Sequence, residues 1–380
     1  MSVAVKNMEI DALNKYKTLA VVVVIICLLI GAFFLIKSNQ TNQAANAMKV
    51  FNKKYSAGEA LQTSGDYSGA LNTFNTLLKD APGKAAEGRL KIFIATNLLL
   101  RNEGNDQSKG MQMYKEVLND QQMPAKVRSS ALIDLASFII KEDETFYRTY
   151  FNDPPFNTFL PSSGTSSLKT LTAYLKMLQL SDEIYPNSFA EYLIAGSYYR
   201  LLLNYKSLRG TTTPEQIART MQEYVKRADV LAPTDQSSYK PFIMLTSYYY
   251  RARAINRSSD VLKNISLVER ENAWKLALVK GAPYENGKDF FSIDRMMLIR
   301  LRYALFLNIN FGKERYADII NLLKPFGRAV SSSDTMFKMT RARFTSGNVF
   351  STSSEKNRVL ALAKISPEFK EFLTSVGLEP

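Results

Sequence analysis

The stretch that decides the fold is GDYSGALNTFNTLLKDAP, residues 65–82. Its first two residues, Gly-Asp, are a turn signal, and apolar side chains then recur at helical spacing. A helical pattern also precedes the turn, over roughly 51–63, and the second pattern covers roughly 68–79. Pro82 ends the second helix because proline cannot continue one. The sequence therefore predicts two antiparallel helices joined by a tight turn.

Small residues lie where these two helices would approach each other most closely. Gly58 and Ala70 have little or no side chain to separate the helix axes, and Phe74 follows four residues after Ala70. We expect Phe74 to fill the space between this pair of helices and the next one. Together with Pro82, these residues resemble a tetratricopeptide repeat, a helix–turn–helix unit of about 34 residues. Leu77 departs from that pattern, because the family usually has a small residue there.

Weaker matches to the same repeat recur over most of residues 50–325. A single helical pair cannot bury its apolar face alone, so neighbouring pairs must stack. The resemblance implies an all-α fold, in which stacked antiparallel helix pairs form a tetratricopeptide-like α-solenoid. The residues predicted to pack the repeats are Gly58, Ala70, Phe74, Pro82, Gly196, Ala228, Pro233 and Ala317.

The run LAVVVVIICLLIGAFFLI, residues 19–36, contains no charged residue. A helix of that length covers about 27 Å, close to the thickness of the hydrocarbon core of a bilayer. The sequence therefore predicts one transmembrane helix and a single-pass protein of the prokaryotic cytoplasmic membrane. Lys15 and Lys17 adjoin the run and favour an amino terminus inside, with an extracytoplasmic C-terminal domain. A cleaved signal peptide and a lipid-modified Cys27 are the alternatives.

Breaks in the pattern divide the chain into segments. Prolines mark one inserted loop, and serine and threonine residues mark a linker before the C-terminus. The predicted segments are a short N-terminal tail (1–18), the transmembrane helix (19–36), a stalk (37–50), an N-terminal repeat lobe (51–151), an inserted loop (152–167), a C-terminal repeat lobe (168–330), a Ser/Thr-rich linker (331–354) and C-terminal capping helices (355–380).

The composition excludes several kinds of chemistry. The chain has no histidine and one cysteine, so it lacks the commonest general base, the commonest metal ligand and any Cys-His nucleophile. The acidic cluster at 142–144 has no metal-site spacing and is interpreted as a solvated turn. We therefore expect no enzyme activity, no cofactor and no metal. The net charge of +14 fits an acidic partner, and no nucleic-acid-binding motif is present.

Two similar stretches suggest a surface for such a partner. GSYYRLLL (196–203) and SYYYRARAI (247–255) place Arg200 and Arg251 at corresponding positions of two predicted helices. Arginine binds carboxylates through two parallel hydrogen bonds, and tyrosine offers rigid contact area. The predicted partner-binding residues are Arg200, Tyr248, Arg251 and Arg302. The alternative is that the tyrosines pack between helices while the arginines extend to solvent.

The function that follows from the resemblance is recognition. The sequence predicts a membrane-anchored scaffold at the cell envelope that binds protein partners or acidic peptide segments, beside secretion or envelope-assembly machinery. One alternative is a structural subunit of a larger membrane-associated assembly, and another is an enzyme that uses carboxylates or hydroxyls. The oligomeric state stays open.

Overall fold

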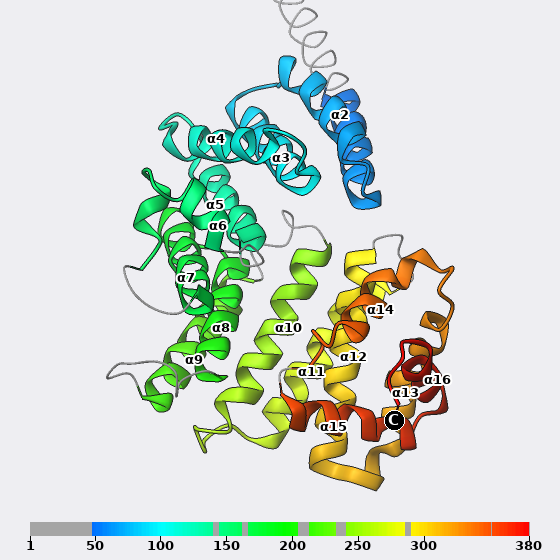
Figure 1. Ribbon diagram of the computed structural model, residues 1–380. Coiled ribbons are helices and arrows are strands. Elements are labelled where there is room, and N and C mark those ends of the chain that lie inside the picture. The colour runs from blue at the N-terminus through cyan, green and yellow to red at the C-terminus, as the bar shows by residue number, and fades with distance from the viewer. Residues whose placement is uncertain are drawn as a thin grey trace, which may run out of the picture. The chain divides into compact units, whose positions relative to one another are not determined.

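The computed structural model describes residues 48–139, 144–161, 166–203, 213–232, 241–285, 290–350 and 352–379, and the regular elements in these ranges are helices (Figure 1). The chain divides into two compact units, Met1–Gly83 and Lys84–Pro380. The division falls inside the predicted lobe 51–151.

The first unit contains the predicted helix pair. One helix covers 48–64 and the next, α2, covers Tyr67–Lys79. Gly65 has a φ of +87°, a left-handed conformation that glycine adopts without steric cost. The side chain of Asp66 accepts a hydrogen bond of 2.8 Å from the amide of Gly69, which caps α2. The structure therefore confirms the helix boundaries that the Gly-Asp turn signal predicted.

The two helices of this pair approach closely at Gly58. A Cβ atom added to Gly58 would lie 2.7 Å from the ring of Phe74, closer than carbon atoms pack. Ala70 and Phe74 are fully buried, and the ring of Tyr55 lies 5.9 Å from that of Phe74. Pro82 is exposed, three residues beyond the end of α2.

The second unit is a succession of helices. They are α3 (Lys84–Arg101), α4 (Asp106–Asn119), α5 (Ala125–Ile139), α6 (Glu144–Tyr150), α7 (Ser166–Ile184), α8 (Ser188–Leu203), α9 (Pro214–Leu231), α10 (Pro241–Ser258), α11 (Leu267–Gly281), α12 (Phe290–Phe311), α13 (Tyr316–Leu323), α14 (Lys338–Thr345), α15 (Ser353–Ala361) and α16 (Pro367–Ser375). Short 3₁₀ helices η1 (Phe156–Thr158), η3 (Ala282–Tyr284), η4 (Gly312–Arg315), η5 (Lys324–Ala329), η6 (Thr335–Phe337) and η7 (Leu362–Lys364) connect several of them.

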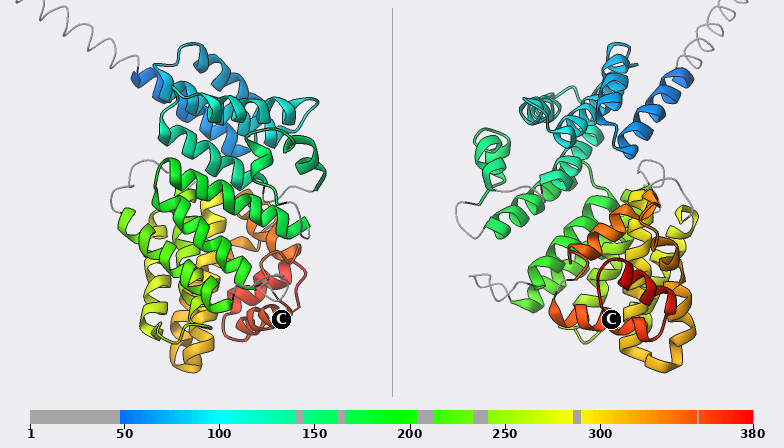
Figure 2. Two further views of the ribbon diagram at one scale, coloured as in Figure 1. Left: turned by 90° about the vertical axis from the view of Figure 1, so that its left-hand side faces the viewer. Right: turned by 45° about the vertical axis from the view of Figure 1, so that its right-hand side comes forward.

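Most of these helices pack as antiparallel pairs in chain order. Helix α3 contacts α4, α5 contacts α7, α8 contacts α9, α10 contacts α11, and α12 contacts α13. Successive pairs are joined because α8 contacts α10 and α10 contacts α12 (Figures 1 and 2). This layering is solenoid-like. Tyr198, Tyr224 and Tyr250 pack against both buried apolar clusters of the unit, so the core continues from layer to layer.

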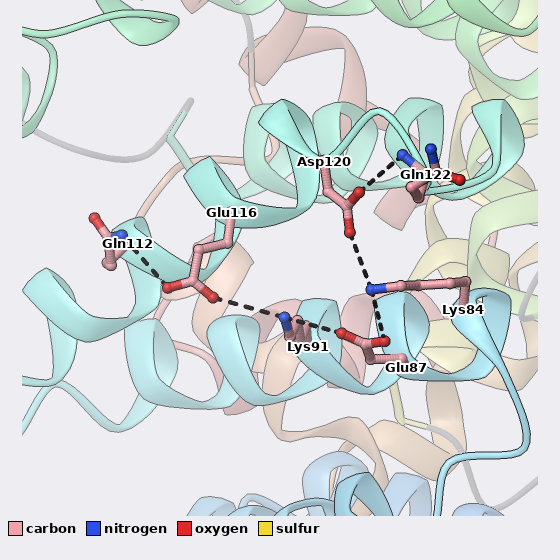
Figure 3. A network of polar contacts seen from close by, with 7 residues as sticks. All are labelled: Lys84, Glu87, Lys91, Gln112, Glu116, Asp120 and Gln122. Atoms are coloured by element: carbon pink, nitrogen blue, oxygen red, sulfur yellow. Dashed lines mark hydrogen bonds and ion pairs between the residues drawn. The ribbon is translucent and has the colours of Figure 1, made fainter.

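An ion-pair network on the surface also connects α3 and α4 (Figure 3). Lys84 Nζ lies 3.1 Å from Glu87 and 3.2 Å from Asp120, and Lys91 Nζ lies 3.1 Å from Glu87 and 3.7 Å from Glu116. Exposed pairs of this kind each contribute about 0–1 kcal/mol. The network therefore supports the α3–α4 contact without dominating it.

The prediction of a transmembrane helix, and with it a single-pass membrane location, is corrected. None of the helices in the described ranges is long and apolar enough to cross a membrane. The longest, α12, has 22 residues and carries Asp294, Arg295, Arg300 and Arg302. The predicted span at 19–36 lies outside the described residues. The fold class of the described residues is all-α and solenoid-like.

The segments predicted as breaks contain ordered packing. In the inserted loop, Phe156 and Phe159 are buried. The Ser/Thr-rich linker folds into η6 and α14, and it buries Phe337 and Phe344. Its helical pattern is weak because α14 has only eight residues.

The C-terminal helices pack on the preceding elements, because α15 contacts α12 and α16 contacts η5. Ser366 caps α16 by accepting a hydrogen bond from the amide of Phe369, with Pro367 at the first helical position. The side chains that hold this end together are aromatic and fully buried. They form a C-terminal aromatic cluster of Phe326, Phe344, Phe369 and Phe372, with ring centres 4.9–6.2 Å apart.

Candidate functional site: the arginine and tyrosine residues of helices α8, α10 and α12

The first helices of three successive pairs carry the arginine and tyrosine residues that the sequence singled out. Helix α10 lies between α8 and α12 and contacts both (Figure 1). Gly196 on α8 permits the approach to α10, because a Cβ there would lie 2.5 Å from the ring of Tyr250. The pairing of GSYYR with SYYYR therefore corresponds to a real helix–helix contact. The predicted partner-binding residues nevertheless fall into three different environments.

Arg251 is bound to a carboxylate within the chain. Its Nε donates to Asp229 Oδ1 at 2.7 Å and its Nη2 donates to Oδ2 at 2.8 Å. The hydroxyl of Tyr192 donates to the same Oδ1 at 2.5 Å, and the ring of Tyr248 lies 6.1 Å from that of Tyr192. Because this bidentate pair satisfies the Arg251 guanidinium from α9, Arg251 serves to hold α9 against α10.

Arg302 is buried and also bound within the chain. Its guanidinium donates to Glu355 on α15 and to the backbone carbonyl of Val349. Arg253 is buried beside it, 3.7 Å from the same carboxylate, and donates to the hydroxyl of Tyr199. Burial lowers the pKa of Arg253 well below its ordinary value, and the positive charge of Arg302 adds to this. Arg302 therefore attaches the C-terminal helices to α12.

Arg200 lies in the third environment, beside Tyr250. Its Nη2 donates to the hydroxyl of Tyr250 at 3.2 Å. From α12, the guanidinium of Arg295 lies 4.8 Å from the ring centre of Tyr249 and 5.9 Å from that of Tyr250. Burial alone would raise the pKa of Tyr250, but the positive charges of Arg200 and Arg295 outweigh it and the pKa is lowered. Two arginines from α8 and α12 therefore act on this one tyrosine.

Arg343 reaches the same region from α14. Arg343 donates from Nη2 to Asp294 Oδ2 at 2.7 Å and from Nε to Oδ1 at 3.2 Å. Asp294 is almost fully buried at the start of α12, and Thr340 donates to it as well. This pair fixes α14 on α12, and Arg343 contributes to lowering the pKa of Tyr250.

A buried carboxyl pair on neighbouring helices was not predicted. Arg227 Nη2 on α9 lies 2.6 Å from Asp182 Oδ2 on α7 and 2.8 Å from Glu191 Oε1 on α8. Burial and the negative charge of Asp182 together raise the pKa of Glu191 to about 7, against the attraction of Arg227. No local pattern predicts this group, because its members come from three helices and Arg227 lies 45 residues after Asp182.

The residues predicted to pack the later repeats differ in burial. Ala228 is fully buried in α9, whereas Ala317 is exposed on α13. Pro233 lies outside the described residues, just after the end of α9 at Leu231. Among the described residues, no group of three or more acidic or cysteine side chains could hold a metal ion.

Three comparisons with known proteins found no match to this chain. No family model, no curated protein and no solved structure matches it.

Proposed function

We propose that this protein is a tetratricopeptide-like scaffold that binds an acidic segment of a protein partner, and that its mechanism is recognition rather than catalysis. The support comes from the layered helix pairs and from the basic charge of the chain. Since fold alone does not fix function, the proposal depends on the residues of α8, α10 and α12.

The observation that carries the proposal is the meeting of Arg200 and Arg295 beside Tyr249 and Tyr250. Arginine and tyrosine are the residue types that contribute most to binding at protein interfaces. The positive charges of the two arginines favour a negatively charged ligand. Arg251 and Arg302 pair with carboxylates of the chain, so we assign them to the framework and not to the partner surface.

The proposal is tested with fluorescently labelled peptides and the full-length chain. One peptide carries glutamates spaced by glycine, and a matched peptide carries glutamines in their place. We expect fluorescence anisotropy to detect binding of the glutamate peptide at low salt, with an affinity that falls as salt is added because charges between exposed groups are screened. Equal binding of both peptides, or binding that salt does not change, would contradict an acidic-segment scaffold.

A further inference from the structure

We propose that Asp182, Glu191 and Arg227 form a pH-sensitive latch, which holds the C-terminal half of α9 against α7 and α8 and loosens when a proton leaves its carboxyl groups. The proposal goes beyond the proposed function, because it concerns how the chain holds α9 and needs no partner. Each member comes from a different helix. Asp182 lies near the end of α7, Glu191 lies in the first turn of α8, and Arg227 lies near the end of α9.

One nitrogen of Arg227 serves both carboxyl groups of the latch. Its Nη2 donates to Asp182 Oδ2 at 2.6 Å and lies 2.8 Å from Glu191 Oε1. The two acidic side chains are 8% and 1% exposed. When both are ionised, two negative charges therefore share one positive charge in a place that largely excludes water. Like charges held this close in a low dielectric repel each other, which favours the protonated form of one of them.

The outer oxygens of the two carboxyl groups give a second, independent indication. Asp182 Oδ1 and Glu191 Oε2 are buried, and among the described residues no donor forms a hydrogen bond to either of them. A buried acceptor without a donor is costly. A protonated Glu191 can donate a hydrogen bond to Asp182, whereas an ionised carboxylate can only accept one. One proton therefore supplies the donor that the ionised pair lacks.

The other polar contacts of α9 near the latch do not titrate near neutral pH. The ring centre of Tyr224 lies 5.1 Å from the guanidinium of the latch. On the α10 side, Arg251 binds Asp229 with its Nε 2.7 Å from Oδ1, and Tyr248 lies in the field of this same pair. Phenols are neutral and arginine–carboxylate pairs are ionised around neutral pH. A change in pH near 7 therefore acts on α9 through the latch.

The direction of the effect follows from the charges around Glu191. Those of Asp182 and Arg227 act on it most strongly, and the neighbouring Glu183 on α7 is exposed, so solvent screens it. Burial and the charge of Asp182 raise the pKa of Glu191 to about 7, against the attraction of Arg227. A glutamate that opens to solvent has a lower pKa and releases its proton. A rise in pH through about 7 therefore favours the open form.

The latch is tested by amide hydrogen exchange of the full-length protein, followed by mass spectrometry at about pH 6 and about pH 8. Protection factors correct for the effect of pH on the exchange of free peptides. The amides of residues 222–231 should lose about 3- to 10-fold in protection at the higher pH, whereas the amides of α3 should keep theirs. Equal protection of residues 222–231 at both pH values, or an equal loss in every helix, overturns the latch.

Two substitutions in the latch should abolish or reduce this pH effect. Glu191→Gln has the shape of the protonated acid and cannot ionise, so residues 222–231 should keep at the higher pH the protection that they have at the lower pH. Asp182→Asn removes the second negative charge and should reduce the pH effect. Circular dichroism shows whether each variant is folded, and Asp182→Asn decides the outcome if Glu191→Gln does not fold.

Glu183→Gln is the matched control. It removes an exposed carboxyl group from the residue after Asp182, so the pH effect should remain as in the wild type. A pH effect that persists unchanged in the folded Glu191→Gln and Asp182→Asn proteins, or that disappears in Glu183→Gln as well, overturns the latch.

Discussion

Replacing Glu191 by glutamine tests the buried carboxyl pair between α7 and α8. The Glu191 side chain is 1% exposed. Glu191 and Asp182 both form ion pairs with the same arginine, Arg227. Burial, and then the charge of Asp182, raises the pKa of Glu191 from 4.5 to about 7. Glutamine has the shape of the protonated acid and carries no charge. The substitution therefore removes the cost of ionising this group inside the protein.

The sign of the pH effect follows from the two pKa values. Because the pKa of Glu191 is higher in the folded protein than in the unfolded chain, its favourable contribution to stability is complete below about pH 4.5 and is lost as the pH rises through about 7. At about 1.4 kcal/mol for each pH unit between the two values, the full loss is about 3 kcal/mol. Since Arg227 is 54% exposed, solvent screens the charges of this group of three side chains, and we expect about 1–3 kcal/mol.

The measurement is urea unfolding of the wild-type and Glu191→Gln proteins, followed by circular dichroism at about pH 5 and about pH 8. The variant should gain about 1–3 kcal/mol in stability over the wild type between the lower and the higher pH. In an Asp182→Asn background the gain should shrink, because the repulsion between the two carboxylates is gone. A stability difference that is the same at both pH values would refute the reasoning.

Three further substitutions test the packing. Gly58→Leu forces a side chain against Phe74 and should lower the stability of the first helix pair by about 1–3 kcal/mol. We expect faster proteolysis within residues 48–79, and an unchanged rate of proteolysis would contradict the close approach of the two helices. Phe326→Ala empties the C-terminal aromatic cluster and should lower stability by about 3–5 kcal/mol, so an unchanged thermal midpoint would show that the cluster is not a tight core. Ser366→Ala removes the cap on the Phe369 amide and should cost about 1 kcal/mol; amide hydrogen exchange in α16 should accelerate, and equal rates would argue against the cap.

Local signals in the sequence were sufficient to predict the two helices of the first pair and the turn between them. The Gly-Asp turn, Gly58 and Phe74 all act between residues close in the chain, and the structure confirms the helices that they predicted. The same holds for the start of α16 at Ser366. The weak helical periodicity of residues 331–354 led to the prediction of a linker, whereas this segment contains α14. A helix of eight residues is too short to repeat its apolar pattern, and α14 is stabilised by its contacts with α12.

The candidate site could be predicted only in part, because its charges are balanced over long distances in the chain. Arg251 and Arg302 belong to helices that the sequence identified, but their carboxylate partners lie 22 and 53 residues away. No local pattern indicates which arginine will meet an aspartate. The apolar run at 19–36 predicted a membrane span by the same local reasoning, and the described helices do not contain one.

The C-terminal aromatic cluster has a consequence for the order in which the chain can be completed during translation. Phe326 belongs to η5, yet the rings that cover it include Phe369 and Phe372 on α16. At about 5–20 residues per second, a ribosome needs roughly 2–9 s to add the intervening residues. Throughout that interval the nascent chain exposes apolar side chains that α16 covers in the folded protein. A ribosome that stalls before α16 would release a product prone to aggregation, even though the preceding layers had already folded.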